Sequence, residues 1–173
     1  MIIMKTVIGI PAFNEEENIA KIITKLKKLS YSIIVCNDGS SDMTGEIAEE
    51  MGVIVINHPK NLGYGSAIRS IFTKASELNF DILVTFDSDG QHKTSDIKSV
   101  LKPIINQQAD IVIGSRFSND DSNEVPTYRK IGIKAITALA NSTSDNKISD
   151  SQSGFRAYNK KILNQIIPSD TGM

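Results

Sequence analysis

Two carboxylates stand one residue apart directly after an apolar run, and this pair is well suited to chemistry. Asp87 and Asp89 follow Ile82–Phe86, an apolar segment typical of a buried strand. Carboxylates placed in this way can share Mg²⁺ or Mn²⁺, which prefer oxygen ligands and fill their shells with phosphate and water oxygens. An acidic turn with Gly90 at a positive φ is the alternative. The position after a buried strand favours a metal–diphosphate site.

Polar residues also follow other apolar runs. They form the segments Pro11-Ala12-Phe13-Asn14-Glu15, Asn37-Asp38-Gly39-Ser40-Ser41-Asp42 and Gly114-Ser115-Arg116. Ligands of parallel α/β sheets bind outside the carboxyl ends of the strands, so we expect these segments to form one site. Asp38 is suited to accept hydrogen bonds from a nucleobase edge and Glu15 to hold a ribose diol. The same residue types also favour turns and helix caps.

A glycine pair imitates part of the dinucleotide-binding fingerprint. Gly63 and Gly65 open an expected helix after a strand, but the third glycine is missing and the motif falls in the third βα unit. A glycine-permitted turn is therefore favoured over an NAD site. Lys60 and Asn61 lie beside this turn, within reach of a phosphate or a base.

These residues need a scaffold, and the periodicity predicts one. Short apolar runs alternate with longer helical patterns, which indicates an α/β fold with a mostly parallel sheet covered on both faces. The expected strands are Thr6–Ile10, Ser32–Asn37, Val53–Ile56, Ile82–Phe86, Ile111–Gly114 and Phe155–Tyr158. The expected helices are Glu15–Leu29, Thr44–Met51, Gly65–Leu78, Ser95–Asn106, Arg129–Asn141 and Ile162–Ile167.

Composition narrows the class of protein. The chain has 173 residues and a formal net charge of −1, which fits one domain over residues 1–173 and gives no electrostatic basis for binding nucleic acid. Its one cysteine, Cys36, lies in an apolar run and is interpreted as core packing. Without a signal peptide or an apolar stretch of about 20 residues, a cytoplasmic location is expected. His58 is interpreted as a loop residue.

The last third of the chain is less regular. Residues 118–126 are polar and predict a surface loop, and the apolar face of Arg129–Asn141 is expected to pack on the sheet rather than on a membrane. The chain stops at Met173 without a closing element. We therefore expect it to be truncated on its C-terminal side.

Six segments, taken in order, resemble family-2 glycosyltransferases of the GT-A fold. These are the three polar segments above together with Asn61-Leu62-Gly63, Asp87-Ser88-Asp89-Gly90-Gln91-His92 and Ser153-Gly154-Phe155-Arg156. The match runs from about residue 5 to residue 160 and is most similar to the polyprenyl-phosphate branch, which includes dolichyl-phosphate mannose and glucose synthases. The resemblance implies a Rossmann-like three-layer α/β/α fold.

The resemblance also implies an activity and a site. A hexose would pass, with inversion, from a UDP- or GDP-sugar to a polyprenyl phosphate at the cytoplasmic face of the membrane. The donor would be held by Pro11, Ala12, Asn14, Glu15, Asp38, Lys60, Gly63 and Asp87. Mg²⁺ or Mn²⁺ would be held by Asp87, Asp89 and Gln91. The acceptor phosphate or the sugar would be met by Arg116, Arg129 and Ser153, with Asp89, Arg116 and Arg129 as the catalytic set.

Such a transfer needs little help from a general base. A phosphate monoester is already an anion near neutral pH, so leaving-group stabilisation and alignment matter more than a general base. Arginine suits the alignment because its guanidinium binds phosphate in a bidentate way. We therefore expect no obligatory base, and His92 is the residue that could overturn this expectation.

Three other functions remain open at this point. One is a glycosyltransferase that acts on a polysaccharide or protein hydroxyl, which would need a carboxylate base. Another is an NAD-binding oxidoreductase built on Gly63 and Gly65, which leaves the Asp87 and Asp89 pair unexplained. The last is a catalytically silent nucleotide-binding module.

Overall fold

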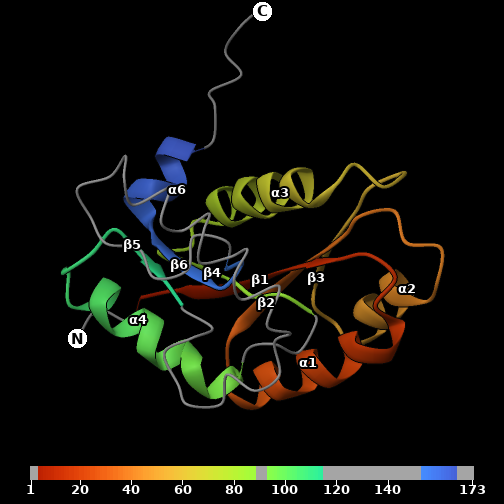
Figure 1. Ribbon diagram of the computed structural model, residues 1–173, viewed down its shortest axis with the longest axis horizontal. Coiled ribbons are helices and arrows are strands. Elements are labelled where there is room, and N and C mark those ends of the chain that lie inside the picture. The colour runs from red at the N-terminus through yellow and green to blue at the C-terminus, as the bar shows by residue number, and fades with distance from the viewer. Residues whose placement is uncertain (1–3, 89–92, 115–152, 167–173) are drawn as a thin grey trace, which may run out of the picture.

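The computed structural model describes residues 4–88, 93–114 and 153–166, and its elements alternate between strand and helix (Figure 1). The strands are β1 (Thr6–Ala12), β2 (Ser32–Asn37), β3 (Ile54–Asn57), β4 (Ile82–Thr85), β5 (Ile111–Ile113) and β6 (Arg156–Asn159). The helices are α1 (Glu16–Lys28), α2 (Thr44–Glu50), α3 (Tyr64–Glu77), the 3₁₀ turn η1 (Thr94–Asp96), α4 (Ile97–Ile105) and α6 (Lys160–Ile166). The alternation predicted from periodicity is confirmed for these elements. The expected loop at 118–126 and helix Arg129–Asn141 lie outside the described residues.

The strands form one mixed, mostly parallel sheet in the order β3-β2-β1-β4-β6-β5. β3, β2, β1 and β4 pair in parallel, whereas β6 runs antiparallel to both β4 and β5. Because β6 runs the opposite way, its first residues lie where the parallel strands end. The segment before Arg156 therefore reaches the rim at which ligands of such sheets bind.

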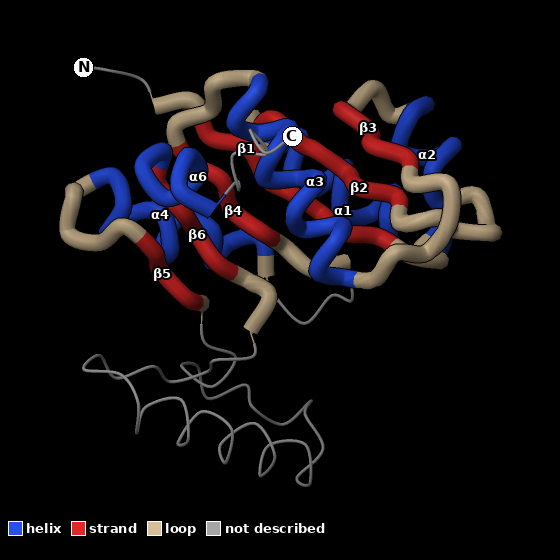
Figure 2. The backbone as a smooth tube through the Cα atoms, turned by 90° about the horizontal axis from the view of Figure 1, so that it is seen from above, coloured by secondary structure: helices blue, strands red, loops and turns tan. Residues whose placement is uncertain are grey.

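Helices cover both faces of this sheet, so it forms the middle of three layers (Figure 1). Seen from above, α3 and α6 lie over the strands (Figure 2). On one face α1, α2 and α4 pack over a core that includes Ile8, Ile10 and Val84. On the other face α3 and α6 pack over a second core that includes Val7 and Leu83. Alternate strand residues supply the two cores, as the two-residue period of a strand requires, and this explains the nearly continuous apolar strand sequences.

The order of the strands creates a crevice between β1 and β4. The chain builds β1, β2 and β3 outward in one direction and then returns to place β4 on the other side of β1. The β1–β4 register covers Thr6 to Gly9 and continues with the hydrogen bond from Phe86 N to Gly9 O, at 2.9 Å. Beyond that point β1 continues to Ala12 along β2 alone. Open α/β sheets bind ligands at such a reversal of strand order.

The length of β1 differs from the prediction for a physical reason. The apolar pattern predicts an end at Ile10, but Pro11 and Ala12 remain paired with Cys36 and Asn37 of β2. Proline cannot donate to a ladder and is tolerated where a strand has no partner on one side. Pro11 occupies such a position, since the pairing of β1 with β4 ends at Gly9.

Candidate functional site: a cavity at the strand-order reversal

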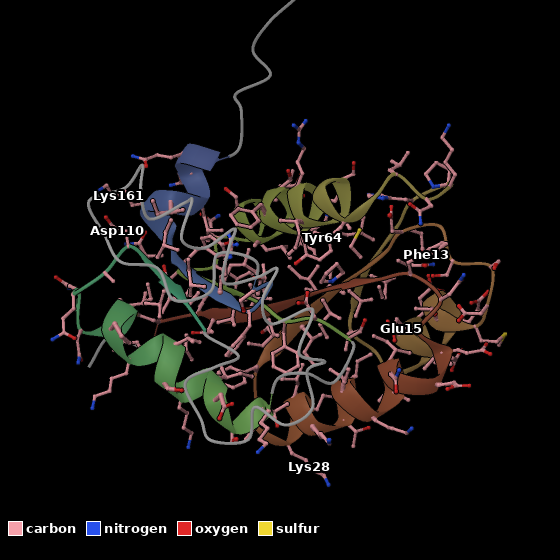
Figure 3. The ribbon with its side chains drawn as sticks, viewed as in Figure 1. Phe13, Glu15, Lys28, Tyr64, Asp110 and Lys161 are labelled. Atoms are coloured by element: carbon pink, nitrogen blue, oxygen red, sulfur yellow. The ribbon has the colours of Figure 1, made fainter. Side chains whose placement is uncertain are left out.

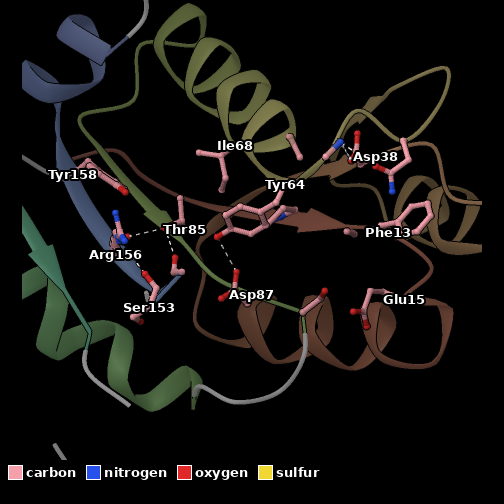
Figure 4. Close-up of a pocket in the computed structure, with 17 residues that line it drawn as sticks. Phe13, Glu15, Asp38, Tyr64, Ile68, Thr85, Asp87, Ser153, Arg156 and Tyr158 are labelled. Carbon is pink, nitrogen blue, oxygen red and sulfur yellow. Dashed lines mark hydrogen bonds between the residues drawn. The ribbon is translucent and has the colours of Figure 1, made fainter. Parts of the chain in front are cut away.

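A cavity of about 630 Å³ opens at the carboxyl ends of β1, β2 and β4. The close-up shows Asp38, Phe13 and Glu15 toward one end and Thr85, Asp87, Ser153 and Arg156 toward the other, with Tyr64 between them (Figure 4). Its walls are made by Pro11, Ala12, Phe13, Glu15, Asp38, Asn61, Gly63, Tyr64, Ala67, Ile68, Thr85, Asp87, Ser88, Ser153, Gly154, Arg156 and Tyr158. This volume is within the range of small-molecule sites.

Asp38, directly after β2, lies at the centre of the first end of the cavity, the end that Phe13 and Glu15 also line. Its Oδ1 accepts hydrogen bonds from His58 Nδ1 (2.6 Å) and from the backbone N–H of Leu62 (3.0 Å), and its Oδ2 accepts one from the N–H of Gly63 (2.8 Å). Burial disfavours the charged carboxylate, but the hydrogen bonds from His58, Leu62 and Gly63 outweigh that penalty and lower the pKa of Asp38. Asp38 is therefore an ionised acceptor on the cavity wall.

His58 is more than the loop residue that the sequence suggested. Its side chain is 9% exposed, and its Nε2 lies 2.8 Å from Ser70 Oγ on α3. Its backbone N–H donates to Asn37 O at 2.9 Å, which extends the pairing of β2 and β3. A histidine before a proline carries no signal of burial in the sequence, so only the tertiary structure brings it to Asp38.

Asn14 supports the wall without lining it. Its backbone N–H donates to Ser40 Oγ (3.0 Å), and its Oδ1 accepts from the N–H of Ser41 (2.9 Å). The neighbouring N–H of Glu15 donates to Thr44 Oγ1 at 2.8 Å. Asn14 has a φ of 54°, a left-handed conformation that asparagine tolerates better than most residues. These bonds tie the loop after β1 to the loop after β2.

The predicted substrate-binding residues thus fall into two groups. Seven of them line the cavity: Pro11, Ala12, Glu15, Asp38, Gly63, Asp87 and Ser153. Asn14 and Lys60 are not among its lining residues; the first faces the neighbouring loop, and the backbone of the second packs against Gly39. Phe13 and Glu15 lie toward one end of the molecule, Tyr64 lies nearer its middle, and the Asp110–Lys161 pair lies toward the opposite end (Figure 3).

Asp87 lies at the second end of the cavity, which Thr85, Ser153 and Arg156 also line. Its Oδ1 accepts a hydrogen bond from the Tyr64 hydroxyl at 3.1 Å. Burial and the nearby negative charge of Asp87 raise the pKa of Tyr64, so the phenol stays protonated and donates. The carboxylate also lies directly against Gly154, where any Cβ would overlap both of its oxygens. Tyr64 and Gly154 therefore fix the position of Asp87 from two sides.

The start of β6 completes this end. Thr85 Oγ1 donates to Gly154 O (2.6 Å), and Arg156 Nε donates to Ser153 O (2.8 Å). The rings of Phe86 and Phe155 meet edge to face, with centroids 5.5 Å apart. The sequence motif around Phe155 included Arg156, but nothing in the sequence indicated that β6 is antiparallel. Thr85 was not expected on the wall, and Tyr64 and Arg156 stood inside motifs without an assigned role, whereas Phe13 belongs to a segment that was expected at the site.

One of the three predicted metal ligands, Asp87, lies on the described wall. The other residues predicted for metal binding or catalysis lie outside the described residues; these are Asp89, Gln91, Arg116 and Arg129. His92, the residue that could overturn the expectation of no obligatory base, lies outside them as well. Within the described part of the chain, no cluster of three or more His, Cys, Asp or Glu side chains could hold a metal. Two carboxylates and an amide are oxygen ligands that suit Mg²⁺ or Mn²⁺, so the predicted set is chemically consistent with Asp87 on this wall.

No helix in the ranges that the structure describes is long and apolar enough to cross a membrane.

A mostly parallel sheet with a cavity at the reversal of its strand order defines an open α/β protein whose ligand site lies at the carboxyl ends of its strands. The chain belongs to Glycosyl transferase family 2, whose family profile matches residues 7–167. It is therefore a glycosyltransferase, as the ordered motifs predicted. The oxidoreductase alternative is not supported, because the family match covers nearly the whole chain and is to glycosyltransferases.

Curated relatives carry names from the polyprenyl-phosphate branch. A UDP-N-acetylglucosamine–dolichyl-phosphate N-acetylglucosaminyltransferase of Methanococcus voltae is 37% identical, over 89% of this chain and 69% of its own length. A dolichol-phosphate mannosyltransferase of Pyrococcus furiosus is 34% identical, over 92% of this chain and 47% of its own length. The chain thus spans between about half and two thirds of these proteins.

Solved structures agree on the fold. Glucosyl-3-phosphoglycerate synthase of Mycobacterium tuberculosis, in complex with Mn²⁺, UDP and product, superposes with a TM-score of 0.69 at 20% identity. Mannosyl-3-phosphoglycerate synthase of Rubrobacter xylanophilus gives a TM-score of 0.73 at 16% identity. Each alignment covers 92% of this chain and 58% or 54% of the other. The fold is that of GT-A glycosyltransferases, as predicted.

Proposed function

We propose that this chain is the donor-binding part of a metal-dependent inverting glycosyltransferase that moves a hexose from a nucleotide diphosphate sugar to a polyprenyl phosphate. The observation that carries the proposal is the cavity itself, with the ionised Asp38 at one end and Asp87 at the other. The names of relatives in the polyprenyl-phosphate branch support this acceptor class.

The first end of the cavity suits a nucleoside. Asp38 would accept an N–H of the base, and Glu15 would hold the ribose hydroxyls. Phe13, which is 46% exposed and lines the same end, offers an aromatic face against which a base can stack. Pro11 and Ala12 form the apolar floor between them.

The second end suits the diphosphate and the transferred sugar. Asp87, with Asp89 and Gln91, would hold Mg²⁺ or Mn²⁺, which when bound offsets the negative charge of the departing diphosphate. Arg116 and Arg129 would bind the acceptor phosphate, and Ser153 would lie near the sugar. Asp87 is kept in position for this role by Tyr64 and Gly154.

The reaction follows from these assignments. An oxygen of the acceptor phosphate attacks the anomeric carbon as the bond from that carbon to the diphosphate oxygen breaks, and the nucleoside diphosphate leaves with the bonding electrons. One displacement inverts the configuration at this carbon. The nucleophile is already an anion, so no side chain has to act as an obligatory base. The arginines would align the two anions for this single step.

The direct test is to incubate the purified chain with UDP- or GDP-sugars and Mn²⁺, with and without polyprenyl phosphate, and to look for a glycolipid by mass spectrometry. The proposal expects a lipid-linked hexose only when all three components are present. Transfer to a polysaccharide or protein hydroxyl instead would contradict the acceptor assignment. If His92→Ala abolishes turnover while donor binding is unchanged, the base-free mechanism is wrong.

A further inference from the structure

His58 holds the back of the Asp38 carboxylate, away from the cavity. Its Nδ1 lies 2.6 Å from Asp38 Oδ1, and its Nε2 lies 2.8 Å from Ser70 Oγ and 3.6 Å from Cys36 Sγ. The side chains of His58 and Asp38 are 9% and 5% exposed. The imidazole is thus fixed between β2 and α3, with one nitrogen directed at the carboxylate.

The direction of this hydrogen bond follows from the chemistry of the two groups. An ionised carboxylate only accepts hydrogen bonds, so Nδ1 of His58 carries the proton and donates it to Oδ1. Nε2 can then accept the hydroxyl hydrogen of Ser70. This arrangement fixes the ring by both of its nitrogens.

The number of acceptor sites on Asp38 is therefore limited. A carboxylate can accept about four hydrogen bonds, two on each oxygen. On Asp38, Oδ1 is filled by His58 and Leu62, and one of the two sites on Oδ2 is filled by Gly63. One acceptor site remains, on Oδ2, for a ligand that enters the cavity.

Nucleobases differ in what they offer to such an acceptor. The pairing edge of uracil carries one N–H, flanked by two carbonyl oxygens. The pairing edge of guanine carries an N–H and an adjacent amino group, which together match two free carboxylate oxygens. A carboxylate with one free site fits uracil and leaves one guanine donor without a partner, which is costly when it is buried.

We propose that His58 is a positioning residue that makes the donor site selective for uracil over guanine. It acts through Asp38, because it occupies Oδ1 and leaves Oδ2 alone to face the base. This inference rests on the proposed function and extends it by naming the nucleotide class of the donor. Ser70 contributes by holding the imidazole from behind.

Two substitutions separate the donated hydrogen bond from the packing. In His58→Asn the side-chain amide nitrogen can take the place of Nδ1 and still donate to Asp38. In His58→Gln the amide group lies nearer the place of Nε2, so the donor to Asp38 is lost while the contact with Ser70 can be kept. Ser70→Ala removes only the support behind the ring.

The experiment measures the dissociation constants of UDP and GDP, each with Mn²⁺, by isothermal titration calorimetry on the whole chain. The wild type is expected to prefer UDP. In His58→Gln this preference should fall by about ten-fold or more, the factor for one hydrogen bond to a charged group. His58→Asn should keep most of the preference, and Ser70→Ala should reduce it slightly.

A role in packing alone would weaken UDP and GDP equally and leave their ratio unchanged in every variant. Any of three results would overturn the inference while leaving the glycosyltransferase proposal intact. The first is an unchanged ratio in every variant, the second is a wild-type preference for GDP, and the third is an equal ratio of the two dissociation constants in His58→Asn and His58→Gln. If the wild type binds neither nucleotide, the proposed function fails and the inference fails with it. If His58→Gln does not fold, the ratios of the GDP and UDP dissociation constants in His58→Asn and Ser70→Ala decide. Both ratios are expected to lie between the wild-type value and unity. A ratio in Ser70→Ala equal to that of the wild type would contradict the role of Ser70 in holding the imidazole.

Discussion

The Asp87 carboxylate lies against Gly154, although the two residues are far apart in sequence. Asp87 follows β4 and Gly154 precedes β6, and these strands run in opposite directions. A Cβ at position 154 would overlap both carboxylate oxygens. The motif Ser153-Gly154-Phe155-Arg156 therefore needs its glycine for a reason that belongs to another segment of the chain. It leaves space for the acidic residue at the end of β4.

Gly154→Ala should move Asp87 rather than unfold the protein. The overlapping atoms are at the free end of a side chain, so we expect a loss of about 1 kcal/mol or less in the free energy of unfolding. The displaced carboxylate should lose its hydrogen bond from Tyr64, and Mn²⁺-dependent UDP binding should weaken by about ten-fold. Urea unfolding and calorimetric titration measure the two effects.

Gly65→Ala is the matched control, since a Cβ at position 65 meets nothing within 4 Å. It lies in the first turn of α3, where alanine in place of glycine should stabilise the helix by about 0.5–1 kcal/mol. If Gly154→Ala binds UDP and Mn²⁺ as tightly as Gly65→Ala does, Gly154 does not control the position of Asp87.

Gly39→Ala should be far more damaging than Gly154→Ala. Gly39 has a φ of 70°, and a Cβ there would collide with the backbone of Lys60 and Asn61, which cannot rotate away. We expect about 1 kcal/mol from the left-handed conformation and about 1–3 kcal/mol more from the overlap. Gly52→Ala isolates the first contribution, because Gly52 has a φ of 62° and its nearest neighbour is Lys27 Nζ at 4.0 Å. Equal losses of stability in urea for the two variants would refute the close packing of the loops.

The strands and the polar residues at their ends could be predicted because each follows from local patterns. β2 lies where the apolar run places it, at Ser32–Asn37, and Asp38 and Asp87 follow their strands as expected. The direction of β6 and the burial of His58 depend on contacts between distant segments, which no local pattern encodes. Arg156 and Tyr64 were missed on the wall for the same reason, although both stood inside motifs that had been singled out.

The thiol of Cys36 should be inert in the folded protein. It is completely buried, and burial, with a further contribution from the charge of Asp38, raises its pKa to about 12. At pH 8 the thiol is therefore protonated and shielded, and the thiolate is the reactive form. We expect no reaction with Ellman's reagent in buffer and one equivalent per chain in concentrated urea. Rapid labelling of the folded chain would show that β2 and α3 do not enclose this residue.

The stabilising contribution of the Asp38 carboxylate should be lost in acid. Its pKa is lowered in the folded state because the hydrogen bonds from His58, Leu62 and Gly63 outweigh the effect of burial. Between that lowered pKa and the ordinary value of about 3.9, the folded chain binds fewer protons than the unfolded chain. The contribution of Asp38 to stability is therefore fully present above about pH 5 and is lost as the pH falls through the folded pKa.

Asp38→Asn should consequently be less stable than the wild type at pH 6, and the difference should shrink as the pH is lowered toward 3. Urea unfolding at several pH values measures this dependence for each protein. Glu50→Gln, at an exposed position at the end of α2, reports the effect of the change in net charge alone. If Asp38→Asn and the wild type lose stability in parallel between pH 6 and pH 3, the carboxylate of Asp38 is not stabilised by its three donors. The count of free acceptor sites on which the preference for uracil depends would then be wrong as well.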